Sequence, residues 1–216
     1  MKSPLHTGTR VLGIALLAAI PLIGLTVPAS AAPAAGTPIT YDLQSTAAGQ
    51  TANSTIPVTV DASSSPASVA PGGAVAVTLA TGALTVPSSA SGYTIKDIQG
   101  IALDIAVPTN STYVSCSLSG GSGLGSGTNT CAQSGSDVVV KIPGPIAGGA
   151  TATLPTLTIN VTAGSSGSID TKLAGTSYSD PGLTFTAVVS VIGIPVNAPT
   201  NGYPTTSPVL ASTSIS

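Results

Sequence analysis

The sequence predicts an all-β protein, an antiparallel immunoglobulin-like β-sandwich preceded by a cleaved signal helix. Apolar residues alternate with polar or small ones over runs of strand length, and each run is bounded by Gly, Pro, Ser or Asn. No helical period follows the first 31 residues. Several short strands separated by such turns favour two packed antiparallel sheets.

The first 31 residues have the three parts of a secretory signal peptide. A positively charged start precedes the apolar residues 11–27 (VLGIALLAAIPLIGLTV), and small residues around Ala31 suit a cleavage pocket. A membrane-spanning helix is the alternative, but the run falls short of the roughly 20 apolar residues a bilayer requires and is interrupted by Pro21. We expect export, cleavage after Ala31 or Ala35, and no transmembrane segment in the mature chain.

Six runs alternate clearly enough to assign an inward and an outward face. In residues 100–108 (GIALDIAVP), Ile101, Leu103, Ile105 and Val107 are expected to face inward. In the other runs the expected inward residues are Ile56, Val58, Val60, Val75, Val77, Leu79, Val138, Val140, Ile142, Leu157, Ile159, Val161, Leu183, Phe185, Ala187, Val189 and Val191. The outward positions are mostly Thr, Ser and Ala, which solvate a sheet without charge.

Turn sequences separate these runs. Pro71-Gly72-Gly73 predicts a turn before the run at 74–79, because proline fixes φ and glycine permits positive φ. Similar Gly-, Pro- and Ser-rich stretches lie at residues 86–92, 144–150, 163–168 and 179–182.

The chain is expected to form one domain with two less structured flanks. After the signal peptide at 1–31, residues 32–38 (APAAGTP) look like a flexible linker. The β-sandwich domain is expected at 39–194. Residues 195–216 are rich in Pro, Thr and Ser and predict an extended C-terminal tail.

The expected mature chain carries very little charge. Three Lys and seven Asp remain once the signal is removed, a balance of −4, and no His, Arg, Glu or Trp is left. Three scattered Lys cannot form the basic surface that nucleic-acid binding requires. Without His, neither a Ser-His-Asp triad nor Cys-His catalysis is possible. Asp97 and Asp104, close in sequence, would stand roughly 23 Å apart on one extended strand. We therefore expect no enzyme and no cofactor.

Cys116 and Cys131 predict a single disulfide, because an exported chain reaches an oxidising compartment. A zinc site would need further thiolates or imidazoles, and none remain. The glycine-rich residues 120–127 between the two cysteines lack the helix and the Lys of a phosphate loop, so we interpret them as a mobile hairpin loop. No calcium-loop spacing occurs, which leaves Asp137, Asp170 and Asp180 as unpaired candidates and predicts no metal site.

Several segments resemble a family of secreted actinobacterial proteins of unknown function with an immunoglobulin-like β-sandwich. The segments are GYTIKDI (92–98), TYVSCSLSGGSGLGSG (112–127), PGPIAGGATATLPTLTINV (143–161) and LAGTSYSDPGLTFTAVVSV (173–191). Some members carry enzyme-like names such as cyclase or dehydratase, but the resemblance implies no active-site residues. In members of that family a Cys often follows the first Tyr-Asp and pairs with one near the C-terminal Tyr-Pro. Leu43 and Gly202 occupy those places here, so the resemblance does not extend to that clamp.

Two functions remain open from the sequence. The first is a secreted, non-enzymatic β-sandwich that binds an envelope component or itself, at the cell envelope or outside the cell, through shape and backbone hydrogen bonds. The second is a carrier of a small apolar ligand such as a lipid, because inward Ala residues and a single Phe would leave space in the core. A continuous apolar pocket would favour the carrier, whereas a solid core with an exposed patch or unpaired edge would favour assembly.

Overall fold

The computed structural model describes residues 36–216, and the predicted signal peptide and cleavage site lie outside the described residues. The described chain is all-β, as the sequence predicts. It contains no helix able to cross a membrane. The strands are β1 (Thr37–Ala47), β2 (Gln50–Ser65), β3 (Ser68–Val69), β4 (Ala74–Thr81), β5 (Ala83–Thr85), β6 (Ser89–Ala90), β7 (Tyr93–Ala106), β8 (Ser111–Ser119), β9 (Thr130–Ser134), β10 (Asp137–Ile142), β11 (Ile146–Ala147), β12 (Thr151–Thr153), β13 (Thr156–Ala163), β14 (Gly167–Thr171), β15 (Leu183–Val191), β16 (Ile194–Pro204) and β17 (Ala211–Ile215).

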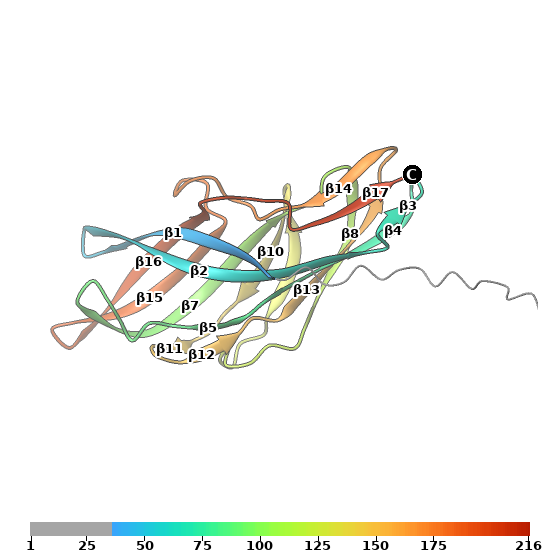
Figure 1. The fold of residues 1–216 in the computed structure, drawn as a ribbon. Helices are drawn as coiled ribbons and strands as arrows, with labels where there is room; N and C mark the ends of the chain where they lie inside the picture. The colour runs from blue at the N-terminus through green and yellow to red at the C-terminus, as the bar shows by residue number, and fades with distance from the viewer. Residues whose placement is uncertain (1–35) are drawn as a thin grey trace, which may run out of the picture.

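One 12-stranded sheet makes up most of the molecule and curls until its two edges meet (Figure 1). Its order is β8-β13-β4-β2-β1-β16-β15-β7-β10-β9, with β6 and β11 also paired to β7. Every ladder in this sheet is antiparallel. A three-stranded sheet, β14-β17-β3, lies at the end near the C-terminus, and β5 pairs with β12. The immunoglobulin-like pair of separate sheets is therefore not confirmed.

Strand β2 makes the corner of this curled sheet because it changes partner along its length. Its first part pairs with β1, from Gln50 to Val60. Its last part pairs with β4, from Val60 to Ser65. Only Val60 has partners in both neighbours, Thr37 and Thr81. From Gln50 to Thr59 the edge of β2 that faces away from β1 therefore has no ladder partner in the described chain, and after Val60 β2 pairs with β4 alone.

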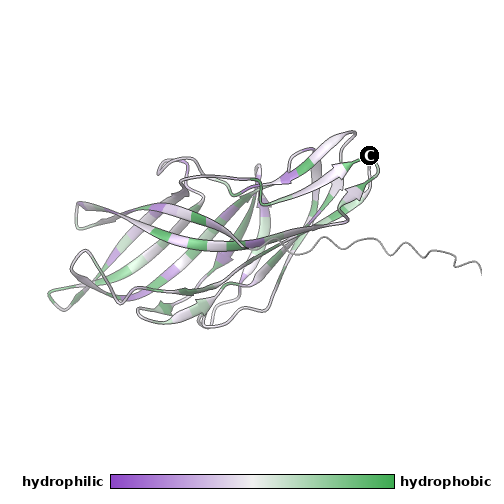
Figure 2. Ribbon diagram, viewed as in Figure 1, coloured by the Kyte–Doolittle hydropathy of each residue, from purple (hydrophilic) through white to green (hydrophobic). Residues whose placement is uncertain are grey.

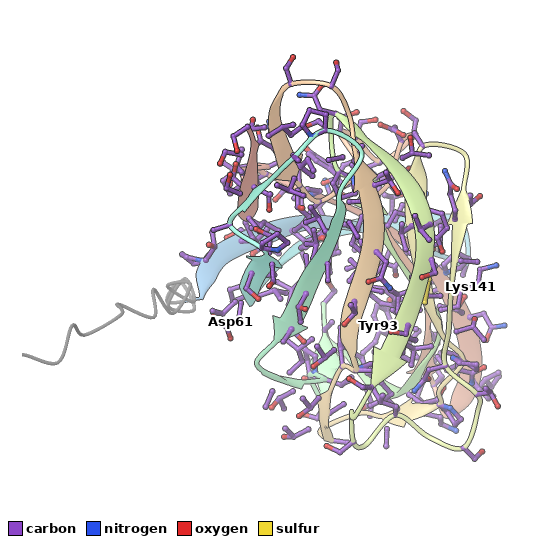
Figure 3. The ribbon with its side chains drawn as sticks, turned by 90° about the vertical axis from the view of Figure 1, so that its right-hand side faces the viewer. Asp61, Tyr93 and Lys141 are labelled. Atoms are coloured by element: carbon purple, nitrogen blue, oxygen red, sulfur yellow. A yellow bond between two sulfur atoms is a disulfide. The ribbon has the colours of Figure 1, made fainter. Side chains whose placement is uncertain are left out.

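The predicted disulfide between Cys116 and Cys131 is confirmed, and it lies at the seam of the sheet. Cys116 is on β8 and Cys131 is on β9, the first and last strands of the order, with their Cα atoms 6.1 Å apart. Cys131 pairs with Val140, next to the labelled Lys141 in Figure 3, where the yellow bond is visible. The bond therefore joins two edges that share no ladder.

The predicted alternation of inward and outward residues is confirmed in the strands around the closed part of the sheet. Val77, Val138, Ile142 and Ile159 are each fully buried, at 0% exposure. The predicted turn is also present: Gly72 has φ 75°, and the Gly73 amide donates to the Ala70 carbonyl at 2.9 Å. Figure 2 shows the resulting mixture of apolar and polar residues along each strand.

The expectation of a C-terminal tail at 195–216 is wrong, and the folded part begins before residue 39. Residues Ile194–Pro204 form β16, which lies between β1 and β15 inside the large sheet, and β17 lies between β14 and β3. The prolines are tolerated because of their positions. Pro195 and Pro199 lie where β16 pairs with β15 alone, and Pro204 is its last residue.

The first and the next-to-last strands of the described chain, β1 and β16, are held together by antiparallel pairing. Leu43 and Gly202, the places where the resembling family has cysteines, are direct partners in this ladder. The Leu43 side chain lies where a Cβ on Gly202 would be. A buried leucine and a hydrogen-bonded ladder therefore stand in for a covalent clamp.

The glycine-rich loop is packed against the body and is not a free hairpin. Leu124 is buried in the core, and Ser122 and Thr153 exchange backbone hydrogen bonds of 2.9 and 3.0 Å. A Cβ on Gly123 would lie 2.6 Å from the Thr151 carbonyl, and one on Gly125 would meet the Gly144 backbone at the same distance. These glycines permit close approach of backbone segments. This packing accounts for the glycine-rich composition of residues 120–127, and no phosphate-binding role is needed to explain it.

We predict that replacing both cysteines (C116S/C131S) lowers the free energy of unfolding by about 3 kcal/mol, because the 15-residue link across the seam is lost. Urea denaturation monitored by circular dichroism measures this. Substitutions at the neighbouring Ser117 and Thr130 are the control and should have little effect. A loss well below 1 kcal/mol for the double variant would contradict a stabilising role for the bond.

Cysteines at Leu43 and Gly202, which are direct partners in the ladder between β1 and β16, should form a second disulfide. We expect the Leu43→Cys/Gly202→Cys variant to lose two hydrogen atoms when it is oxidised by air, a decrease that intact mass measures, and to unfold at a higher temperature. The Leu43→Cys/Asn201→Cys variant is the control, because a shift of one residue places the two side chains on opposite faces of the sheet. Equal crosslinking of both variants would contradict the register.

Candidate functional site

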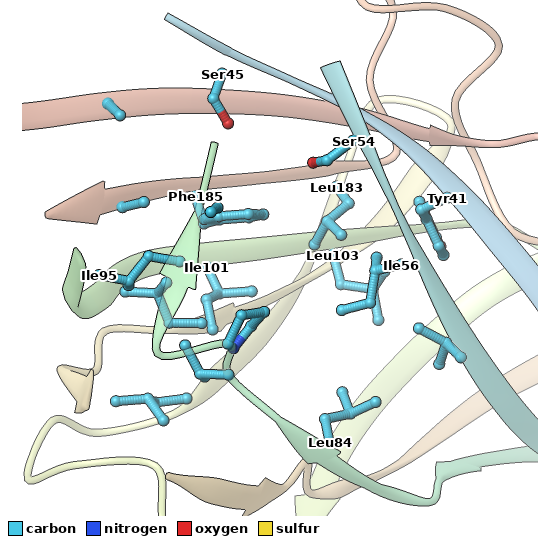
Figure 4. Close-up of a pocket in the computed structure, with 18 of the residues that line it drawn as sticks. Tyr41, Ser45, Ser54, Ile56, Leu84, Ile95, Ile101, Leu103, Leu183 and Phe185 are labelled. Atoms are coloured by element: carbon cyan, nitrogen blue, oxygen red, sulfur yellow. The ribbon is translucent and has the colours of Figure 1, made fainter. Parts of the chain in front are cut away.

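An apolar cavity of about 340 Å³ lies inside the open half of the curled sheet. Ligand pockets typically measure about 300–1,000 Å³. Figure 4 shows Ile56 of β2 and Leu84 of β5 facing Leu103 of β7 and Leu183 and Phe185 of β15 across this space. The walls are almost entirely aliphatic, and Phe185 is the only phenylalanine in the chain.

The alternating pattern of β15 supplies one wall. All five residues that the sequence predicts to face inward on this strand line the cavity: Leu183, Phe185, Ala187, Val189 and Val191. They are of different sizes, and the small Ala187 leaves room between larger neighbours. A run predicted as core therefore forms part of the cavity wall.

Strand β7 supplies the facing residues by breaking its own alternation. Its ladder with β15 shifts register between Val188 and Val189 and again between Thr184 and Thr186. As a result Ile95, Ile98 and Ile101, spaced three residues apart, all line the cavity. Strict period two would have turned Ile98 outward. The residues 92–99 therefore give no clear strand signal in the sequence.

The mouth of the cavity lies beside the free edge of β2. From Gln50 to Pro57, the ladder of β2 within the described chain is with β1 alone. Ala52, Ile56 and Val58 line the cavity from this strand, and the segment 84–93 lines it from the opposite side. The opening exists because β4 leaves β2 after Thr81.

Two hydroxyl groups beside the cavity have no hydrogen-bond partner. The Tyr41 hydroxyl and Thr81 Oγ1 are both inaccessible and unpaired, and both residues line the cavity. Burial, and secondarily the negative charge of Asp104, raises the pKa of Tyr41 well above its usual range. Tyr41 is therefore neutral at physiological pH, and no Asp, Glu, Lys, Arg or His lines the cavity.

The structure gathers ionisable residues at a different place, on the outer face of β7 and β10. Asp104 and Lys141 line a shallow hollow beside β9. Burial raises the pKa of Asp104, the charges of Asp137 and Asp180 raise it further, and Lys141 lowers it. Burial likewise raises the pKa of Asp137. Sequence spacing could not show this cluster, because Asp180 reaches it through a loop whose Gly182 carbonyl accepts from the Asp104 amide at 2.8 Å.

The structure pairs two of the aspartates considered from the sequence with hydroxyl groups. Asp170 lies on β14, where it accepts hydrogen bonds from Ser168 and Ser212 at 3.0 and 2.6 Å. Asp180 accepts one from Thr176 at 2.7 Å. Among the described residues, no three Asp or Cys side chains are placed to hold a metal ion. The Asp104 hollow brings one carboxylate and one ammonium together, without a histidine or free thiol.

Comparison with known proteins shows a similarity in fold. No protein-family model and no curated protein matches the sequence. The fold is similar to a crystal structure from Corynebacterium diphtheriae described as a "Putative membrane anchored protein", with a TM-score of 0.54 and 17% identity. The match covers 84% of this chain but only 37% of that one. At this identity the likeness concerns the fold alone. The similar protein comes from an actinobacterium.

We predict that Asp104→Asn stabilises the protein at pH 7. A raised pKa means that the folded state favours the protonated carboxyl, so stability is full below the ordinary value of 3.8 and is lost as pH rises through the folded-state pKa. Removing the charge removes that loss. Thermal unfolding should therefore show a melting temperature a few degrees above wild type at pH 7, with the difference vanishing near pH 3. A lower melting temperature at pH 7 would contradict the assignment.

Proposed function

We propose that this protein is a non-enzymatic carrier that holds a small apolar ligand, such as a lipid, inside its curled sheet. The observation that carries the proposal is the continuous aliphatic lining of the cavity on strands β2, β7 and β15. Such a surface selects for apolar groups, and its few polar atoms cannot bind a charged substrate.

The energetic cost of the cavity supports this proposal. If it were fully enclosed, an empty apolar void of about 340 Å³ would cost roughly 8 kcal/mol at about 24 cal/mol per Å³, which is an upper limit for a cavity with an opening. Typical stabilities are only about 5–15 kcal/mol. Wetting the lining would also be unfavourable, because aliphatic side chains offer water no hydrogen bonds. An apolar ligand would restore the lost contacts.

Export and action at the cell envelope or outside the cell are part of the same proposal. The signal-peptide pattern at 1–31 supports export, and the disulfide suits an oxidising compartment. The Corynebacterium diphtheriae protein is described as membrane-anchored, which supports an envelope location. We also propose membership in the secreted actinobacterial family that the sequence resembles.

A second candidate function is assembly with an envelope component or another copy of the chain. The free edge of β2 between Gln50 and Pro57 favours this candidate, because an unpaired edge can accept a strand from a partner. This edge also borders the cavity mouth. A carrier would use both the apolar lining and the opening beside the free edge of β2. Assembly would use the free edge alone.

We expect saturable binding of the neutral apolar probe N-phenyl-1-naphthylamine, measured by its fluorescence, to residues 36–216. The Ala52→Trp variant should weaken binding about tenfold or more, because the indole would fill the cavity from β2. Asn53→Trp is the matched control, since Asn53 faces outward, where it accepts from Gln44 at 3.4 Å. Native mass spectrometry of the secreted protein would then identify a natural ligand.

Absence of saturable probe binding would overturn the carrier. Equal loss of binding in both tryptophan variants would also count against it, because the probe would then not occupy the cavity. A defined oligomer without a bound ligand would favour assembly through the β2 edge.

A further inference from the structure

Three two-residue hairpin turns gather at the end of the molecule away from the C-terminus (Figure 1). They are Ala48-Gly49 between β1 and β2, Ser91-Gly92 between β6 and β7, and Ile192-Gly193 between β15 and β16. In each turn both residues have positive φ, 47° and 75°, 51° and 83°, and 51° and 80° respectively. This is the geometry of a type I′ turn, whose first position favours Asn, Asp or Gly.

Ile192 is unfavourable at its position for two separate reasons. A β-branched residue is strained at a φ of 51°. Its side chain is also 98% exposed, so it contributes nothing to the core. Neither strain nor exposure helps the protein to fold, so this isoleucine points to a contact outside the molecule.

Other exposed apolar side chains lie beside Ile192. Five large apolar residues are exposed in the described chain, and three of them, Tyr93, Ile192 and Ile194, belong to these hairpins, at 46%, 98% and 65% exposure. Ile194 pairs with Val191, and the pairing of Ser190 with Thr94 places Tyr93 next to Val191 in register. Figure 2 shows the apolar colour at the tip of the β15–β16 hairpin.

The same end of the molecule carries no charge at its tips. Residues 46–51, 89–94 and 190–195 contain no Asp, Glu, Lys or Arg. Ala48, Ser91 and Val191 also line the cavity, so the exposed surface continues into the apolar interior. Uncharged turns, one of which presents the exposed Ile192, and a neighbouring tyrosine suit the boundary between lipid headgroups and acyl chains, where tyrosine is enriched.

We propose that these three hairpin tips dock on a lipid bilayer, with Ile192 and Ile194 entering its apolar layer and Tyr93 at the headgroup level. The part of the cavity lined by Ala48, Ser91 and Val191 then lies next to the membrane. This docking goes beyond the proposed carrier function and does not depend on which ligand the cavity holds. A protein partner fits less well, because stable interfaces bury about 800 Å² on each side and the tips offer a few separate side chains.

The test uses residues 36–216, which contain all described strands and exclude the apolar segment at 11–27 that would itself bind lipid. Flotation with neutral phosphatidylcholine vesicles measures the bound fraction. We expect binding that changes little with salt, because no charge takes part. Ile192→Asn should lower the partition coefficient about tenfold or more, since it removes a buried isoleucine from the bilayer.

Two controls separate docking from folding and from ligand binding. Ile192→Asn creates the favoured Asn-Gly turn, so its melting temperature should equal or exceed that of the wild type. Val114→Thr changes an equally aliphatic side chain, 59% exposed on β8, and should leave vesicle binding unchanged. Ile192→Asn should still bind the fluorescent probe, whereas Ala52→Trp loses the probe.

Wild-type protein that fails to float with the vesicles would overturn the proposal, as would equal losses in Ile192→Asn and Val114→Thr. Sedimentation showing a dimer that Ile192→Asn dissociates, without vesicle binding, would assign the tips to a second copy of the chain. Flotation of the wild type, together with lost flotation and retained probe binding in Ile192→Asn, would confirm the docking and would leave the carrier proposal unaffected.

Discussion

The architecture depends on one constraint, that an edge of a β-strand can be hydrogen-bonded to only one neighbour at a time. On β2 the edge opposite β1 is taken by β4 only from Val60 onward. Beyond that point the sheet curls into a closed, densely packed body, in which Val77 and Ile159 are fully buried. Before it, β4 has diverged and the two walls stand apart. Part of the core, including Val77 and Ile159, therefore lies away from the cavity, whereas other core residues such as Ile105 also line it.

The disulfide lies where the closed part of the sheet lacks backbone hydrogen bonds between neighbouring strands. Strands β8 and β9 share no ladder although they lie side by side, and the Cys116–Cys131 bond spans this gap. The other long-range closure, between β1 and β16, uses backbone pairing and the Leu43 side chain instead. A covalent link thus occurs where the hydrogen-bond network is interrupted, and none is required where the ladder is continuous.

The open half combines features that stability alone does not favour: a large apolar cavity, a free strand edge, and an exposed isoleucine in a strained turn. All three meet at one uncharged end of the molecule. In the carrier and docking proposals they share one explanation, because an apolar ligand leaving a bilayer would pass from lipid to cavity without crossing water. The acidic cluster around Asp104 lies on the outer face and takes no part in this route.

The sequence by itself determined the all-β class, the inward residues of six strands and the disulfide, because period two and cysteine pairing are local or compositional signals. It could not predict that Ile194–Pro204 is an inner strand, since whether a proline is tolerated depends on which neighbour each part of the strand has. It also could not separate cavity from core. Phe185 and Val191 alternate like Val138 and Ile142, and only the divergence of β4 from β2 leaves the first pair facing open space. Alternation specifies which face of a strand is apolar, whereas the path of the sheet determines what that face meets.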